Sequence, residues 1–408
     1  MIRSLIILFL VSPPLFAQCA WEVRDSAIGK PFERWEATAT IASECDPQYS
    51  EIRDRMLDSL VRFTGVNRLR VEVRAGSENP VDHYAEWRAA GCPTGTDPAY
   101  VRWLQNQYVT VNDNNDSTTD VRGFHFTELD ATIENVVIPL RTRLEAKGED
   151  LHVNVCYVAF TDQNAGGTYL HDQPNEYAEF VSAVYQHLKT KWNIVPDRWE
   201  AVLEPDRVSQ WTASKLGAAL DAAALRLRTD GIEPSFIAPS TSNTSNTIPW
   251  AKDIIAYPNA KAALKELSYH RDSDSNGVNE NATWWLADSL NIRASMLGWS
   301  PEYTKPDVMM NDIIYYNNAV WQQGPINSLF DITRNGDSLS IVRKRNTVTI
   351  GLFSRFIKPG AVRLDVCREI VMKNTDGSFV GYQWPPYLPA LSYGWPTGEV
   401  EYIRVDSL

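Results

Sequence analysis

The sequence predicts an α/β protein whose main part is a (β/α)8 TIM barrel, followed by a small or incomplete C-terminal β-structure. Its 408 residues, of which 44% are hydrophobic and 22% charged, are typical of a globular protein with a sizeable core. Short β-rich runs alternate with amphipathic helical stretches along most of the chain. Eight such units are what a closed parallel barrel requires.

The N-terminus has the pattern of a secretory signal peptide. Arg3 precedes an apolar run over residues 5–11, and the small residue Ala17 follows. The run is too short to span a bilayer, which takes about 20 apolar residues. We therefore expect cleavage near Ala17, a secreted or periplasmic location and no membrane span. A hydrophobic N-terminal strand is the alternative, while lipid anchoring through Cys19 is disfavoured by Gln18 before it.

After residues 1–17, we expect a short β-segment over 18–34, a catalytic barrel over 35–360 and a β-extension over 361–408. The pattern becomes strand-like again after Pro359-Gly360. The last segment is too short for a complete sandwich of about 100 residues.

Within the barrel, strands are expected where β-branched and aromatic residues gather. The expected strands are residues 35–41, 68–73, 151–160, 198–203, 235–239, 264–269, 292–299 and, more weakly, 328–333. The expected helices include residues 51–63, 129–147, 176–191, 213–228 and 308–322. An open doubly wound sheet is the structural alternative, but no glycine-rich phosphate loop follows the first strand.

The longest irregular stretch covers residues 75–126 and follows the second expected strand. In a barrel this position lies on the face where the loops build the active site. We therefore expect this stretch to shape a substrate groove.

The five cysteines contain no CxxC pair, which supports neither a disulfide scaffold nor a zinc site. Cys45 and Cys92 are the candidates for a single bridge. Cys156 lies in an apolar segment and is expected to be a buried, free side chain.

With 39 basic and 51 acidic residues, the net charge of −12 disfavours nucleic acid as a partner. The histidines show no HExxH spacing and there is no G-x-S-x-G elbow, so a metalloprotease and a serine esterase are unsupported. We expect no cofactor and no catalytic metal. Residues 272–277 resemble half of a calcium loop, but Thr283 stands where a bidentate Glu is needed, and a polar turn is the alternative.

Two glutamates follow two of the expected strands directly. Glu204 ends the strand at 198–203 and is followed by Pro205, and Glu302 follows the strand at 292–299. Retaining glycoside hydrolysis needs two carboxyl groups about 5 to 5.5 Å apart. A lone acidic residue beside a turn is more often a helix start or cap, so the pair carries the argument rather than either member.

Several segments resemble family 30 glycoside hydrolases, clan A barrels that include glucosylceramidases and xylanases. Residues 351–364, GLFSRFIKPGAVRL, resemble the exit from the eighth helix of that family. Glu204-Pro205 resembles its acid/base signature, and Trp299-Ser300-Pro301-Glu302 resembles its nucleophile segment. Residues 65–73, with Arg70, are similar to its second strand.

The resemblance implies a secreted retaining glycoside hydrolase that cleaves β-glycosidic bonds of a polysaccharide or glycoconjugate by double displacement. Glu302 would be the nucleophile and Glu204 the acid/base, which should hold its proton near neutral pH because of burial and a nearby negative charge. Arg70 would orient Glu302, Tyr269 would hydrogen-bond it, and His270 would contact a sugar hydroxyl or be structural.

Three tryptophans, Trp299, Trp321 and Trp384, are candidates for stacking on sugars. The substrate partner would be a polysaccharide or oligosaccharide, and the oligomeric state stays open. Leu203 stands where clan A enzymes usually carry Asn before the acid/base, and Pro301 replaces a usual Ser. The alternative function is therefore a non-catalytic secreted carbohydrate-binding barrel.

Overall fold

The structure is a computed structural model that describes residues 21–114, 118–163, 167–298, 305–336, 338–373 and 379–384. Residues 29–362 form one compact unit, and the described residues before and after them belong to a second unit. Each unit is described by itself.

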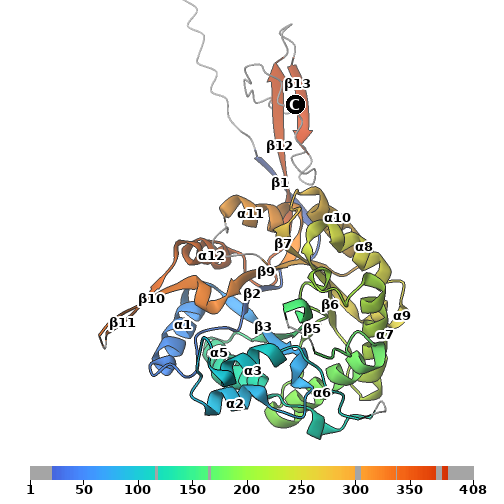
Figure 1. Ribbon diagram of the computed structural model, residues 1–408. Helices are drawn as coiled ribbons and strands as arrows, with labels where there is room; N and C mark the ends of the chain where they lie inside the picture. The colour runs from blue at the N-terminus through green and yellow to red at the C-terminus, as the bar shows by residue number, and fades with distance from the viewer. Residues whose placement is uncertain are drawn as a thin grey trace, which may run out of the picture. The chain divides into compact units, whose positions relative to one another are not determined.

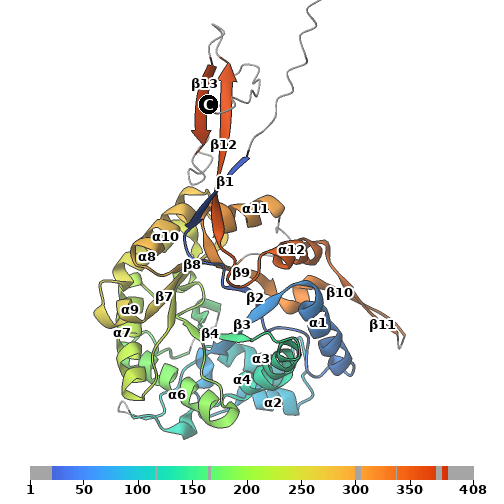
Figure 2. The ribbon, with the colours of Figure 1, turned by 180° about the vertical axis from the view of Figure 1, so that it is seen from behind.

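The larger unit is built on a closed barrel of eight parallel strands in sequence order, which confirms the predicted TIM-barrel fold (Figures 1 and 2). These strands are β2 (Arg34–Thr38), β3 (Val66–Arg74), β4 (His152–Val158), β5 (Arg198–Glu200), β6 (Phe236–Asn243), β7 (Leu264–Ser273), β8 (Arg293–Gly298) and β9 (Asn318–Pro325).

Helices surround the barrel, and the predicted helices near residues 51, 129, 176 and 213 are present. The α-helices are α1 (Tyr49–Phe63), α2 (His83–Ala89), α3 (Pro98–Asn106), α4 (Thr127–Thr132), α5 (Ile138–Glu145), α6 (Pro174–Trp192), α7 (Ala213–Thr229), α8 (Thr244–Ile254), α9 (Pro258–Ala263), α10 (Val278–Ser289), α11 (Pro306–Met310) and α12 (Arg345–Phe356). Shorter 3-10 or π turns are η1 (Ala75–Ser77), η2 (Val121–Gly123), η3 (Ile133–Val137), η4 (Thr161–Gln163), η5 (Pro205–Arg207), η7 (Asn311–Tyr315) and η8 (Ile326–Leu329).

Helix α6 illustrates how the sequence defines these elements. Pro174 occupies its first turn, where a missing N–H is tolerated, and Asn193 ends it in the left-handed conformation. Tyr177, Phe180 and Val184 recur at helical spacing and are fully buried. Burial of this face fixes the helix on the barrel.

The prediction for the eighth barrel strand was wrong. The strand is β9, at Asn318–Pro325, inside the region expected to end a helix at 308–322. Helix α11 stops at Met310, and Asn317 turns the chain with a φ of 46°. Because β9 is buried on both faces between β8 and β2, it has no alternation that marks it as a strand. The expected strand at 328–333 overlaps β10 (Phe330–Asn335), which pairs with β11 (Ser338–Arg343) in a separate hairpin.

Charged side chains cross the inside of the barrel. Arg68 on β3 donates hydrogen bonds of 2.9 and 3.0 Å to Glu266 on β7, which is not a neighbouring strand. It also pairs with Glu36, which accepts further hydrogen bonds from Gln322 at 2.8 Å and Asn154 at 3.3 Å. All five side chains are buried. They form a buried polar layer, referred to below as the Arg68 network, and Asn154 also donates a hydrogen bond of 3.0 Å to Glu200.

The second unit contains a small antiparallel sheet of β1 (Trp21–Ile28), β12 (Arg363–Lys373) and β13 (Phe379–Trp384), in the order β1-β12-β13. This sheet agrees with the small β-structure that the sequence predicts beside the barrel. The segments 1–17 and 385–408 lie outside the described residues, so the signal peptide and the full extent of the extension stay predictions.

The cysteines behave as expected. Cys45 and Cys92 form a disulfide, and Cys156 is free and buried in β4. In the part of the chain that the structure describes, no helix has the length and apolar character needed to cross a membrane.

Candidate active site

Glu204 lies just beyond the C-terminal end of β5. Past Glu200, the chain still bonds to both neighbouring strands, from Ala201 N to the Ile237 carbonyl and from Leu203 N to the Tyr157 carbonyl, each at 2.9 Å. Glu204 then adopts a left-handed backbone with φ 49° and ψ 57°. This conformation is costly for a residue with a Cβ and is usually kept where function requires it. Its side chain is 15% exposed.

His270 links Glu204 to the barrel interior. On β7 the residues Glu266, Ser268 and His270 alternate toward the interior, as the strand pleat requires. His270 Nδ1 lies 3.0 Å from Glu204 Oε1, and its Nε2 lies 3.6 Å from Glu200 Oε1. The imidazole, which is 1% exposed, therefore sits between two carboxylates.

These contacts keep both carboxylates ionised. Burial would raise the pKa of Glu204, but the hydrogen bond and charge of His270, followed by those of Arg207, lower it to about 2. Burial likewise opposes ionisation of Glu200, whose pKa falls to about 2 because of His270 and Arg70. Burial would lower the pKa of His270, yet the two carboxylates raise it to about 9. The group is therefore an imidazolium between two carboxylates at neutral pH.

The expectation that Glu204 holds a proton at neutral pH is wrong for the free protein. The expectation assumed that a negative neighbour would dominate, whereas the groups that bond Glu204 directly are the cations His270 and Arg207. A histidine directly after the aromatic at the end of the expected sixth strand was the sequence signal for this arrangement.

Arg207 and Asp272 complete the exposed edge of this cluster, and sequence reasoning gave neither a catalytic role. Arg207 Nη1 lies 3.1 Å from Glu204 Oε2 and 3.1 Å from Asp272 Oδ2. Burial and the charge of Glu204 raise the pKa of Asp272. Because Asp272 pairs with Arg207 and Asp274 accepts a hydrogen bond of 2.7 Å from Asn243, the 272–277 loop is engaged with protein groups. Within the described ranges there is no cluster of His, Cys, Asp and Glu able to hold a metal ion.

Arg70 lies against the end of β8. It is 8% exposed, and its Nη1 donates a hydrogen bond of 3.1 Å to the carbonyl of Leu297. Leu297 is followed by Gly298, the last residue of β8. The expected role of Arg70 in orienting Glu302 stays a prediction, because Glu302 lies outside the described residues.

Tyr269 and Trp321 are not at the site, and the predictions that they bind substrate were wrong. Tyr269 is fully buried, donates to Asp312 Oδ1 at 2.8 Å and accepts from Asn318 at 2.7 Å. Trp321 is 1% exposed and donates from Nε1 to Asp312 Oδ2 at 3.0 Å. Tyr269 precedes His270 and Trp321 precedes Gln322, and both His270 and Gln322 point into the barrel. Because neighbouring side chains of a strand point to opposite faces, Tyr269 and Trp321 point away from the barrel interior.

Trp299 and Glu302 lie in the segment 299–304, outside the described residues, and the side chain of Trp384 is not described either. The last described residue before this segment is Gly298 on β8, which pairs with His270 on β7. A Cβ on Gly298 would lie 2.4 Å from Cγ of the His270 ring. Gly298, the last described residue before the segment that carries Glu302, therefore lies directly against His270.

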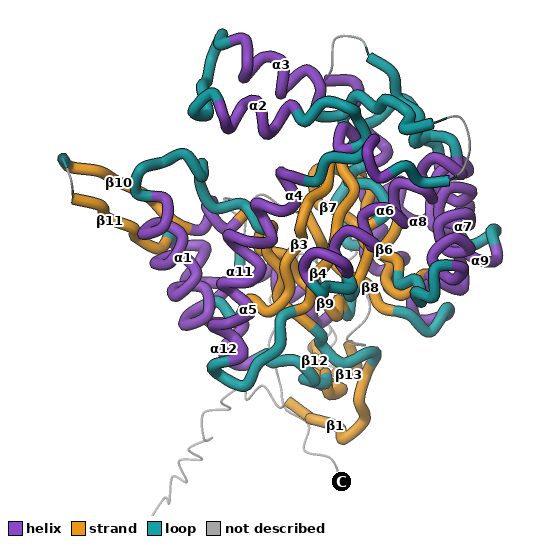
Figure 3. The backbone as a smooth tube through the Cα atoms, turned by 90° about the horizontal axis from the view of Figure 1, so that it is seen from below, coloured by secondary structure: helices purple, strands orange, loops and turns teal. Residues whose placement is uncertain are grey.

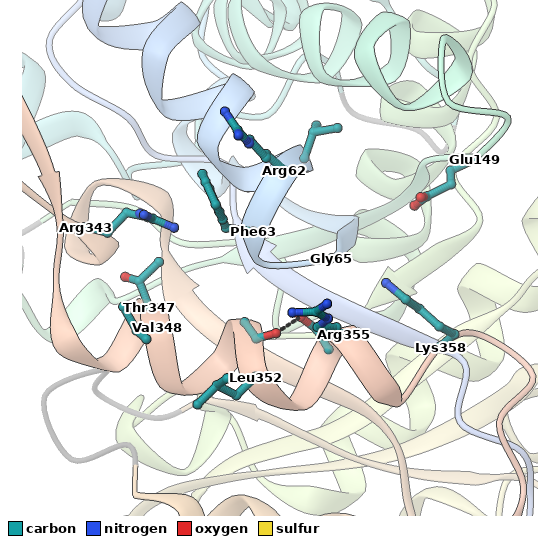
Figure 4. A pocket seen from close by; sticks show the side chains of 13 residues that line it. Arg62, Phe63, Gly65, Glu149, Arg343, Thr347, Val348, Leu352, Arg355 and Lys358 are labelled. Carbon is teal, nitrogen blue, oxygen red and sulfur yellow. Dashed lines mark hydrogen bonds between the residues drawn. The ribbon is translucent and has the colours of Figure 1, made fainter.

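Two cavities help to locate the functional face. One of about 380 Å³ lies between α1 and α12, where Gly65 and Glu149 precede β3 and β4 (Figure 4). Its charged lining is Arg62, Arg343, Arg355, Lys358 and Glu149. It lies at the N-terminal ends of the strands, where barrel enzymes do not place their chemistry.

The other cavity, of about 340 Å³, adjoins the C-terminal ends of β2 and β3 and includes Arg70 and Glu72. It therefore lies on the same face of the barrel as Glu204, where the active sites of TIM-barrel enzymes occur.

No family model matches the sequence, and no curated protein matches it. Solved structures match its fold. A conserved exported protein from Bacteroides fragilis gives a TM-score of 0.55 at 11% identity, covering 85% of this chain and 82% of that one. SrfJ from Salmonella typhimurium gives 0.53 at 14% identity, with coverages of 90% and 93%. The catalytic domain of GH30 xylanase C from Talaromyces cellulolyticus gives 0.51 at 13% identity, with coverages of 88% and 85%.

The structural neighbours thus include the catalytic domain of a glycoside hydrolase. At 11 to 14% identity these likenesses show a shared barrel fold. They say nothing of the substrate or the catalytic residues of this chain.

Proposed function

We propose that the protein is a secreted retaining glycoside hydrolase acting on a β-linked glycan, with Glu204 as acid/base and Glu302 as nucleophile. The observation that carries this proposal is the position of His270. It bonds Glu204 at the end of β5 and packs against Gly298, from which the chain continues toward Glu302. Glu302 is four residues beyond Gly298, a stretch of chain that spans at most about 14 Å.

The ionised state of Glu204 makes His270 part of the proton path. In the first step, the Glu302 carboxylate forms a bond to the anomeric carbon while the bond from that carbon to the leaving oxygen breaks. The leaving oxygen takes a proton from Glu204, which draws it from Nδ1 of the His270 imidazolium, 3.0 Å away. The neutral imidazole remains beside the Glu200 carboxylate.

The second step returns the proton. Water attacks the anomeric carbon and displaces the Glu302 carboxylate, while Glu204 accepts the water proton and passes it to His270. The enzyme ends in its starting state, and the product has the configuration of the substrate. Arg207, which is 57% exposed, is placed to hold Glu204 between turnovers.

A non-catalytic carbohydrate-binding barrel is the second candidate. Leu203 before Glu204 and the low pKa of Glu204 favour it, because a carboxylate held by two cations need not exchange protons. Under this alternative, the protein would bind glycans without cleaving them.

The test is turnover on a panel of neutral plant and microbial β-glycans, beginning with xylan, followed by assay of released reducing ends. We expect one glycan class to be cleaved, and Glu204→Gln and Glu302→Gln each to lower the rate by at least about 100-fold. Glu134→Gln, at an exposed position on η3, is the matched control. Binding of glycans without release of reducing ends would favour the second candidate.

A further inference from the structure

We propose that the cavity beside β2 and β3 is a subsite that binds pyranose rings of a neutral glycan against three aromatic side chains. We call Tyr84, Trp87 and Trp103 the aromatic wall. The inference deepens the proposed function and rests on it for the kind of ligand.

The lining of the cavity comes from several parts of the chain, which include α4 and η3 through Glu128, Ala131, Thr132 and Val136. Its floor is β3, through Arg70, Glu72 and Arg74. Residues 38–44, at the end of β2 and after it, form one side, and the aromatic wall on α2 and α3 forms another. The volume of about 340 Å³ lies within the roughly 300–1,000 Å³ typical of small-molecule sites.

The aromatic wall is not part of the core. Trp87 and Trp103 are stacked, with ring centroids 4.3 Å apart and planes at 15°, and Tyr84 meets Trp103 edge-on at 5.8 Å. All three rings are partly exposed. None of the residues of α2, all of which are described, is buried, and in α3 only Ala99 is. The two helices lie side by side at the edge of the barrel unit (Figure 3), and a hairpin that buries so little of itself leaves its aromatic side chains open to a ligand.

The chain holds this wall in place before any ligand arrives. The disulfide from Cys45 to Cys92 joins the loop after β2 to the chain just beyond α2. Tyr84 donates a hydrogen bond to Glu44, and Trp87 Nε1 donates to the Pro93 carbonyl at 2.9 Å. A wall ordered in this way loses little entropy on binding, which favours affinity.

The charges in the cavity favour a neutral ligand over an acidic sugar. Arg70 pairs with Glu72 at 3.5 Å, Arg74 pairs with Glu128, and no cation lining the cavity lacks a carboxylate partner in the described chain. Thr38, which is 3% exposed, has an Oγ1 with no hydrogen-bond partner among the described residues, and so does the Nε of Arg70. Because both arginines are paired with carboxylates, no cation of the described cavity lining is left to bind the carboxylate of an acidic sugar.

Arg70 connects the lining of this cavity to the candidate active site. This side chain lines the cavity and also bonds Leu297 at the end of β8, and its charge acts on Glu200. A glycan bound at the active site can therefore extend over β3 to the aromatic wall, and affinity should grow with chain length.

The experiment is calorimetric titration of the full chain carrying Glu204→Gln with neutral β-linked disaccharides and hexasaccharides, and with an oligogalacturonate. We expect the hexasaccharide of the preferred series to bind more tightly than the disaccharide. Trp87→Ala should weaken hexasaccharide binding about tenfold, since an aromatic stacking contact is of that order. Trp285→Ala, which removes a 56% exposed ring of another tryptophan pair on α10, is the control and should change nothing.

A second variant guards against misfolding of the hairpin. Ser43→Trp fills the cavity from an exposed position and should give the same loss without touching the stacked rings. The inference is overturned if Trp87→Ala and Ser43→Trp bind the hexasaccharide as Trp285→Ala does, or if the oligogalacturonate binds best. If binding grows with glycan length but the unmutated chain does not cleave the glycan, the proposed hydrolysis is wrong and the subsite stands. If the unmutated chain cleaves the glycan but both variants bind the hexasaccharide normally, the hydrolysis stands and the subsite is wrong.

Discussion

Two groups of charged side chains cross the inside of this barrel, and they differ in exposure and in the matching of their partners. In the Arg68 network, Arg68, Glu36 and Glu266 are at most 1% exposed, and the hydrogen bonds of Arg68 reach both carboxylates. Around His270, the edge opens to solvent through Arg207, which is 57% exposed, and Nε2 stays 3.6 Å from Glu200.

Under the proposed function, the same residue types serve stability in one layer and chemistry in the other. Removing one partner of a buried ion pair leaves an uncompensated charge in the core and strongly destabilises the fold. In the His270 cluster the side chain of Glu204 is 15% exposed, so protons and ligands can reach it. The predictions below test this division.

The largest effect on stability is expected from Arg68→Met. The substitution leaves the buried Glu36 and Glu266 without their cation, which should lower the free energy of unfolding by about 3–5 kcal/mol. Urea denaturation measures it. A loss under about 1 kcal/mol would mean that the network is not the structural layer described here.

Gly298→Ala should damage activity while sparing most of the stability. The new Cβ would lie 2.4 Å from the His270 ring, which must move away from Glu204. A shift of about 1 Å near reacting groups can cost roughly 100-fold, so we expect kcat/KM to fall by about that factor. Activity equal to that of the unmutated chain would show that the position of His270 does not matter.

His270→Gln should change the pH dependence. In the unmutated chain the proton on the Glu204–His270 pair is lost near pH 9, so kcat/KM should decline there. Without the imidazole, the proton is held by Glu204 alone, and the decline should move to acidic pH.

The stability of the unmutated chain has a matching pH dependence. The pKa of His270 is raised from 6.5 to about 9, so its contribution to the free energy of unfolding is complete below pH 6.5 and lost as the pH rises through about 9. The contributions of Glu204 and Glu200 to the free energy of unfolding are complete above pH 4.5 and lost as the pH falls through about 2.

The activity of His270→Gln tests the proton path separately. If its kcat/KM declines at the same alkaline pH as that of the unmutated chain, His270 is not part of the proton path.

Arg207→Ala should have the smallest effect on stability, at most about 1 kcal/mol, because the side chain is largely solvated. Loss of this cation should raise the pKa of Glu204, which a pH titration of its carboxyl group by NMR measures. A large loss of stability would contradict the division between the two layers.

Much of the fold could be predicted because the strands of the first seven units are marked by β-branched and aromatic runs. The eighth was missed because β9 is buried on both faces and carries Asn, Gln and Gly among its apolar residues. The position of Glu204 followed from Pro205, which cannot continue a central strand.

The site itself was predicted less well. Tyr269 was placed at the site together with His270, although neighbouring residues of a strand point to opposite faces. Trp321 was assigned to a helix, so its orientation on β9 could not be predicted. Arg207 and Asp272 are 65 residues apart in sequence and meet only through the tertiary fold. The aromatic wall arises in the long stretch after the second strand, which the sequence does indicate as part of a groove.

The most direct test of the central claim is trapping with a 2-fluoro glycoside of the preferred sugar, followed by peptide mass spectrometry. The account predicts a glycosyl group covalently attached to Glu302, formed in the unmutated chain and absent from Glu302→Gln. A label on another carboxylate, or steady cleavage of the glycan with no covalent intermediate, would contradict it.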